Sequence, residues 1–153
     1  MRANNQQFKV CEVSVSYSPK VKASERYQVF NSKDLYDLLI KFYDENTIEY
    51  KESMKLVLLN KSNKVLGVHH LAEGGIDGVF CDVRQILQIA LLTNSTSIAI
   101  SHSHPSGNTT PSIADKKLTA AIQEGAKTMN IQLLDHIIVT PEKYYSFADE
   151  GLI

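Results

Sequence analysis

Residues 100–115 have the sequence ISHSHPSGNTTPSIAD, in which two histidines, His102 and His104, stand one residue apart. The apolar run TSIAIS that leads into them is typical of a central strand. Side chains two positions apart lie on one face of a strand, so the two imidazoles should lie side by side while Ser103 points away. The Pro-Ser-Gly turn then redirects the chain, and a helix is expected over 112–129.

Two imidazoles on one strand face can bind Zn²⁺ at roughly 2.0–2.1 Å, but a third protein ligand must come from another segment. Asp115 is expected in the first turn of the following helix, where the chain can fold back toward the strand. Two histidines and one aspartate leave a fourth position for water, as catalytic zinc sites do. His102, His104 and Asp115 are therefore candidate metal ligands.

The same stretch also has a purely structural interpretation. Ser112 and Asp115 have the spacing of a capping box, which satisfies unpaired amides at a helix start. A His-x-His pair by itself is also more often not a metal site. The complete pattern H-x-H-x₇-S-x-x-D nevertheless favours a metal site, because it combines two histidines, a tight turn, a serine and an aspartate at fixed offsets. The two interpretations of Ser112 are compatible, since a hydroxyl can accept one hydrogen bond and donate another.

The remaining patterns predict an α/β fold in which helices sandwich one mixed β-sheet. Strands are expected at 8–17, 54–60, 64–72, 96–101, 131–140 and 143–147, and helices at 31–45, 82–94 and 112–129. The chain has 153 residues, enough for a single core. The strand at 8–17 alternates apolar and polar residues and could pair with a partner chain, which would give a homodimer.

Composition excludes several classes of protein. The net charge is −1 and the basic residues are scattered, so charge gives no support for direct DNA binding. The N-terminus has no apolar core of a signal peptide, and the longest apolar run is too short to span a bilayer. Cys11 and Cys81 lie far apart and suggest reduced thiols. We therefore expect a cytoplasmic protein without membrane contact.

The longer run HSHPSGNTTPSIADKKLT resembles a block of the RadC-type DNA-repair family, H-N-H-P-S-G-x-x-x-P-S-x-x-D-x-x-x-T. That family is one branch of the JAB/MPN (JAMM) zinc metalloprotease superfamily. The segments ESMKLVLLN, DVRQILQIAL, LLDHIIVT and YYSFADEG resemble its neighbouring blocks, so the resemblance covers about residues 31–151. It implies a cytidine-deaminase-like JAB/MPN fold over 31–153, preceded by an N-terminal strand and a flexible connection over 1–30.

The resemblance also implies a reaction, the hydrolysis of a peptide or isopeptide bond in a protein or peptide substrate. Zn²⁺ would be bound by His102, His104 and Asp115. Glu52 matches the family's catalytic glutamate, the general base, although the residues alone do not select it from neighbouring glutamates. Ser112 matches the serine that donates a hydrogen bond to the developing oxyanion.

The sequence departs from its branch in three ways, one of which is Gly74-Gly75 in the loop before the second helix, where Gly-Thr is usual. Asn is usual between the ligand histidines, whereas this chain has Ser103. Longer relatives carry an N-terminal helix-hairpin-helix module for DNA, and no such hairpin is evident in the residues before Glu52, which weakens the expectation of direct DNA binding. Asp135 and His136 could orient the imidazoles, but neighbouring strand residues alternate, so at most one of them faces the metal.

Other functions can be tested on the sequence. The zinc-protease pattern H-E-x-x-H and the zinc-deaminase pattern P-C-x-x-C are both missing. Two alternatives to a JAMM-type hydrolase stay open. One is a non-catalytic scaffold with the same fold, and the other is an accessory factor in DNA repair or recombination. The presence of all the ligands, the serine and the glutamate favours the hydrolase.

Overall fold

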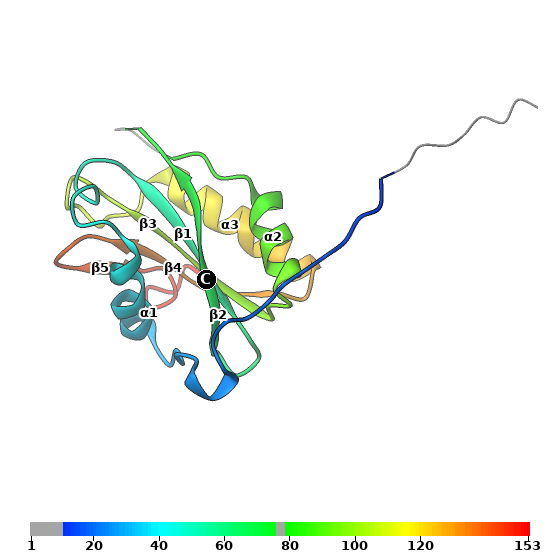
Figure 1. Cartoon of the computed structure of the whole chain (residues 1–153). Coiled ribbons are helices and arrows are strands. Elements are labelled where there is room, and N and C mark those ends of the chain that lie inside the picture. The colour runs from blue at the N-terminus through cyan, green and yellow to red at the C-terminus, as the bar shows by residue number, and fades with distance from the viewer. Residues whose placement is uncertain (1–10, 76–78) are drawn as a thin grey trace, which may run out of the picture.

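The computed structural model describes residues 11–75 and 79–153, and they form one sheet with helices on both faces (Figure 1). The strand order is β2-β1-β3-β4-β5. The strands are β1 (Ser53–Leu59), β2 (Val65–Glu73), β3 (Ser97–Ser103), β4 (Gln132–Val139) and β5 (Tyr144–Ser146). Only β3 and β4 pair in parallel, and the other neighbours are antiparallel. The predicted α/β fold with a mixed sheet is therefore confirmed.

Within the described ranges, three α-helices cover the sheet. They are α1 (Ser32–Leu39), α2 (Val83–Leu92) and α3 (Ile113–Thr128), with short 3-10 turns at Ala23–Glu25 and Ile40–Phe42. Alternation along β1 divides the core. Leu56 packs in the cluster shared with α2 and α3, whereas Val57 packs in the cluster shared with α1. Every residue of β3 is buried, as its apolar sequence predicts for a central strand.

The connection between β3 and β4 places the site. Parallel neighbours need a crossover, and here α3 supplies it. Helix α3 begins at Ile113, only a short loop beyond the end of β3 at Ser103. The first turn of α3 therefore returns to the carboxyl end of β3, which is where open α/β sheets usually bind their ligands.

Two predicted elements differ from the structure. The predicted strand at 8–17 is wrong over 11–17, which pair with no strand, and residues 8–10 lie outside the described residues. A strand needs a partner for its backbone, and this segment contacts the sheet through the Tyr17 hydroxyl, which donates to the Leu66 carbonyl at 3.1 Å. Homodimer formation through this segment stays a prediction.

The helix predicted at 31–45 is also shorter. The α-helix ends at Leu39 and tightens into a 3-10 turn that ends at Phe42. The helical spacing of apolar residues at 35, 38, 39 and 42 predicts that Phe42 is buried, but 49% of its surface is exposed. Among the described residues, no helix has the length and apolarity needed to cross a membrane.

Candidate metal centre

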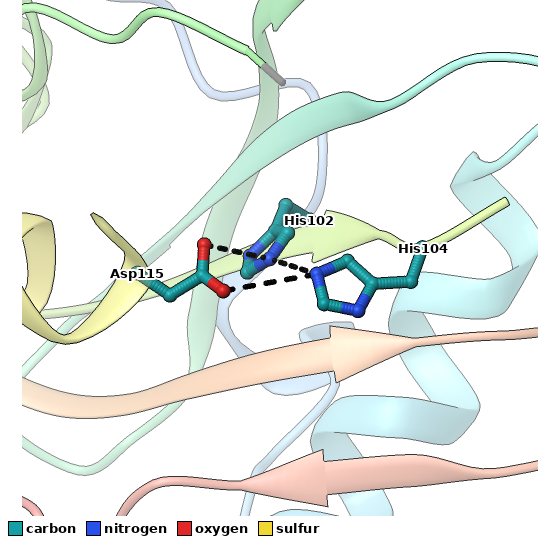
Figure 2. A group of neighbouring side chains, drawn as sticks. All are labelled: His102, His104 and Asp115. Carbon is teal, nitrogen blue, oxygen red and sulfur yellow. Dashed lines mark hydrogen bonds and ion pairs between the residues drawn. The ribbon is translucent and has the colours of Figure 1, made fainter. Parts of the chain in front are cut away.

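Three of the predicted residues converge between the end of β3 and the start of α3 (Figure 2). His102 lies in β3, His104 follows it by two positions, and Asp115 is the third residue of α3. Ser103 points to the opposite face of the strand, as the spacing predicts. The structure therefore brings together one ligand atom from each of the three candidate ligands, all within 4.8 Å of one another.

The separations of these atoms suit one shared ion. The Nε2 atoms of His102 and His104 are 2.9 Å apart. Oδ1 of Asp115 is 3.3 Å from Nε2 of His102, and Oδ2 is 3.8 Å from Nε2 of His104. Ligands at roughly 2.0–2.1 Å from a tetrahedral Zn²⁺ lie about 3.3 Å from each other. The group can therefore bind a metal ion with little rearrangement.

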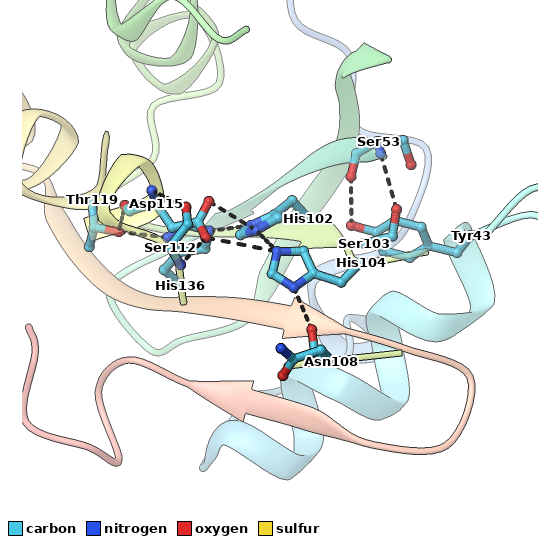
Figure 3. Close-up of polar contacts among 10 residues, drawn as sticks. All are labelled: Tyr43, Ser53, His102, Ser103, His104, Asn108, Ser112, Asp115, Thr119 and His136. Carbon is cyan, nitrogen blue, oxygen red and sulfur yellow. Dashed lines mark hydrogen bonds and ion pairs between the residues drawn. The ribbon is translucent and has the colours of Figure 1, made fainter. Parts of the chain in front are cut away.

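A chain of hydrogen bonds sets the protonation of His102 (Figure 3). The Thr119 hydroxyl donates its single proton to the carbonyl of Asp115 at 2.7 Å, so it can only accept from Nδ1 of His136, also at 2.7 Å. With its proton on Nδ1, His136 accepts at Nε2 from Nδ1 of His102 at 2.7 Å. His102 is then left with a lone pair on Nε2, directed at the metal centre.

The electrostatics of His136 agree with this arrangement. His136 is fully buried, and this burial is the main cause that holds its pKa well below the usual value. It is therefore neutral near pH 7. A neutral imidazole has one donor and one acceptor, as the chain of hydrogen bonds requires.

His104 is held by a different partner with the same result. Its Nδ1 lies 2.6 Å from the carbonyl oxygen of Asn108, which can only accept. Nδ1 must therefore donate, and Nε2 carries a lone pair. Two nitrogen lone pairs and the Asp115 carboxylate thus face one another in a largely buried space. These electron-rich atoms repel one another unless a cation lies between them. The donor set fits a metal ion on this ground.

Asp115 combines both of its predicted roles. The capping box is present, with Ser112 Oγ accepting from the Asp115 amide at 3.0 Å and Asp115 Oδ2 accepting from the Ser112 amide at 2.7 Å. Burial raises the pKa of Asp115, whereas a proton on the neighbouring His102 would lower it and the hydrogen bonds with Ser112 lower it too, so that the pKa lies well below the usual value. Asp115 is therefore ionised at neutral pH, as a metal ligand must be.

The metal centre opens into a cleft of about 480 Å³ that Glu52 and Ser112 also line. This volume lies within the usual range for ligand sites. The lining of the cleft includes the apolar residues Met54, Val79, Cys81 and Leu118 and the polar residues Ser106, Asn108 and Thr110. Both predicted catalytic residues therefore lie around the same cleft as the ligands, and their roles stay predictions.

The prediction that at most one of Asp135 and His136 faces the metal agrees with the structure. His136 faces it, whereas Asp135 accepts hydrogen bonds from the Ser146 hydroxyl at 2.6 Å and the Ala148 amide at 3.0 Å. Asp135 thus ties β4 to β5. Thr119 was assigned no role from the sequence, although its spacing of four from Asp115 places both on one face of α3.

The model of the family described as the RadC-like JAB domain matches residues 29–152. The chain belongs to this family. The predicted RadC-type membership is therefore confirmed. In the RadC-like JAB domain of this chain, the three residues that the family resemblance implies as ligands form a group with the geometry to bind a metal ion.

Several relatives carry names without a stated activity. The UPF0758 protein of Flavobacterium johnsoniae is 37% identical over 125 residues, which are 82% of this chain and 53% of that one. The UPF0758 protein of Clostridium beijerinckii is 38% identical over 126 residues, 82% of this chain and 54% of that one. The UPF0758 protein FN0909 of Fusobacterium nucleatum is 39% identical over 119 residues, which are 76% of this chain and 51% of that one. The chain spans about half the length of these curated relatives.

Proposed function

We propose that the chain is a zinc-dependent hydrolase of the JAMM type that cleaves a peptide or isopeptide bond. The observation that carries the proposal is the convergence of two Nε2 lone pairs and the Asp115 carboxylate in a cleft that Glu52 also lines. Two imidazoles and one carboxylate suit Zn²⁺ better than Mg²⁺, which prefers oxygen ligands only. When bound, Zn²⁺ supplies a Lewis acid that polarises the scissile carbonyl and lowers the pKa of a bound water toward about 7.

In this proposal Glu52 acts as the general base. Its carboxylate takes a proton from the attacking water, holds it, and passes it to the leaving amine. The proton transfers require Glu52 to lie beside the reacting atoms, and its position on the wall of the cleft supports this.

Ser112 is proposed to stabilise the transition state. Its oxygen accepts from the Asp115 amide, and its proton remains available for a second bond toward the cleft. Loss of such a donor to an oxyanion typically raises the barrier by about 3–4 kcal/mol.

A peptide substrate suits the cleft better than a nucleic acid does. Among the described residues that line the cleft, none is Lys or Arg. Phosphate groups would find no Lys or Arg partner there, whereas a neutral peptide segment can contact both the apolar and the polar residues of the lining. We also propose a reducing, cytoplasmic location, because Cys11 and Cys81 are both free thiols.

The deciding experiment compares metal content with turnover. Purified protein should bind about one Zn²⁺ per chain. His104→Ala should lose the zinc, and Glu52→Gln should keep the zinc but lose hydrolysis of internally quenched peptide mixtures and lysine-branched isopeptides. Zinc-loaded protein that cleaves none of these probes, or a Glu52→Gln variant as active as the wild type, would refute the proposal and favour a scaffold.

A further inference from the structure

We infer that Ser103 is the positioning residue for Glu52, with its hydroxyl fixing the backbone on both sides of the general base. This inference rests on the proposed function of Glu52. Ser103 touches neither the metal ligands' nitrogen atoms nor the cleft, so it acts through the backbone.

The hydroxyl of Ser103 makes two hydrogen bonds to the chain around Glu52, and Figure 3 shows the one to Ser53. It accepts from the amide of Ser53 at 3.0 Å and donates to the carbonyl of Lys51 at 3.3 Å. These two groups immediately precede and follow Glu52 in the chain. Ser103 is fully buried, so water does not compete for either bond.

The sheet itself does not hold this segment on the β3 side. The ladder between β1 and β3 ends at the pair Met54 and His102, one residue short of Ser53. The Ser103 hydroxyl therefore replaces the next ladder contact. On the other side, the Gly74 amide donates to the carbonyl of Glu52 at 2.9 Å. The backbone of Glu52 is thus held from both neighbouring segments.

This arrangement couples the base to the metal ligands. The residues 102–104 present two imidazoles to the cleft and one hydroxyl to the opposite face of the same strand. Any shift of the Glu52 backbone relative to the histidines must break a bond to Ser103. Such coupling matters, because a misplacement of about 1 Å can lower a rate by a factor of about 100.

The chemistry of the bridge explains which side chains can make it. The position needs one donor and one acceptor on a short side chain. The Asn that is usual in the RadC-type branch also has both, in its amide nitrogen and oxygen. Alanine has neither. Ser103→Ala should therefore break the bridge, while Ser103→Thr and Ser103→Asn should restore it.

Hydrogen exchange tests the bridge without any substrate. In the full chain loaded with Zn²⁺, Ser103→Ala should exchange the Ser53 amide at least about tenfold faster, because that amide loses its acceptor. Ser103→Thr should exchange it at the wild-type rate. Ser97→Ala is the matched control, since Ser97 is also buried on β3 but lies at the far end of the strand. An unchanged rate at Ser53 in Ser103→Ala would overturn the inference.

Kinetics on the peptide and isopeptide probes test the consequence. Ser103→Ala should lower kcat by about 10- to 100-fold with little change in KM and in zinc affinity, and Ser103→Thr or Ser103→Asn should recover it. In a Glu52→Gln background the same substitution should have no further effect on the residual rate. If Ser103→Ala were as active as Ser97→Ala, the role of Ser103 would be refuted. If the wild type cleaved none of the probes, the proposed function would be refuted, and the role of Ser103 in catalysis would be refuted together with it.

Discussion

A 2.7 Å hydrogen bond joins Nδ1 of His102 to Nε2 of His136 and decides which nitrogen of His102 faces the metal centre as a lone pair. The bond has a defined direction only because Thr119 fixes the proton of His136 on the other side of the ring. A residue of α3 thereby decides, through a residue of β4, which nitrogen of a ligand on β3 carries the proton. Contacts of this kind typically change metal affinity by 10–100-fold.

Thr119→Val should therefore weaken zinc binding although Thr119 touches no ligand nitrogen. The substitution keeps the shape of the side chain but removes the hydroxyl that accepts from His136. His136 can then carry its proton on Nε2 and donate it to Nδ1 of His102. The proton of His102 would then lie on Nε2, the nitrogen that must bind the metal. We expect a loss in zinc affinity of about 10- to 100-fold, measured by competition with a chelator of known affinity.

Thr119→Ser is the matched control for this prediction. It keeps the hydroxyl and removes a methyl group, so zinc affinity should stay within a few-fold of the wild type. Equal zinc affinity in Thr119→Val and Thr119→Ser would show that the hydroxyl does not set the state of His136.

The two roles of Ser112 can be separated by two substitutions. Ser112→Ala should destabilise the fold by about 1 kcal/mol through loss of the helix cap, whereas Ser112→Gly should lower stability by only a few tenths. Both remove the hydroxyl, so both should lower kcat by about 100- to 1000-fold if it donates to the oxyanion. Thermal unfolding and peptide hydrolysis measure the two effects. If kcat fell in Ser112→Ala but not in Ser112→Gly, in proportion to the loss of stability, Ser112 would act only as a helix cap.

The histidine pair and the capping box could be predicted because they depend on local geometry. The spacing of His102 and His104 places them on one strand face, and the Ser112–Asp115 spacing is that of a capping box. The helix over 112–129 was predicted as well, and the central strand followed from its apolar run. Glu52 could not be chosen from the residues, because its approach to the cleft depends on the pairing of β1 with β3, and only the family resemblance selected it.

The choice between Asp135 and His136 required the register of the sheet. Alternation predicts that only one of them faces the metal, but a shift of one residue exchanges the two faces. The register between β3 and β4 is irregular between Ile98 and Ala99, so counting along the strand does not settle it. The strand predicted at 8–17 is wrong over 11–17 for a related reason. Alternation of apolar and polar residues predicts a strand, but it does not show whether a neighbouring strand is there to pair with.

Cys81 should react slowly with alkylating reagents even though it lines the cleft. Burial, with a smaller contribution from the charge of Asp82, raises the pKa of Cys81 to about 11. At pH 8 about one thiol in a thousand is then ionised, and the thiolate is the reactive form. Iodoacetamide should therefore modify the exposed Cys11 first, and the rate at Cys81 should rise about tenfold per pH unit up to pH 10. Mass spectrometry of the two cysteine peptides measures this, and equal rates at pH 8 would contradict it.

Deletion of residues 1–16 should leave the domain folded. In the described part of this segment, residues 11–16, Val13 is 85% exposed and Val15 is 72% exposed, so the removal of these side chains takes little buried surface from the core. Retaining Tyr17 keeps its hydrogen bond to the Leu66 carbonyl. We expect the free energy of unfolding to change by less than about 0.5 kcal/mol and zinc binding to stay the same. Light scattering of both forms tests the predicted homodimer. A full-length dimer that becomes a monomer on deletion would place the partner contact in this segment. A monomer in both forms would refute the homodimer.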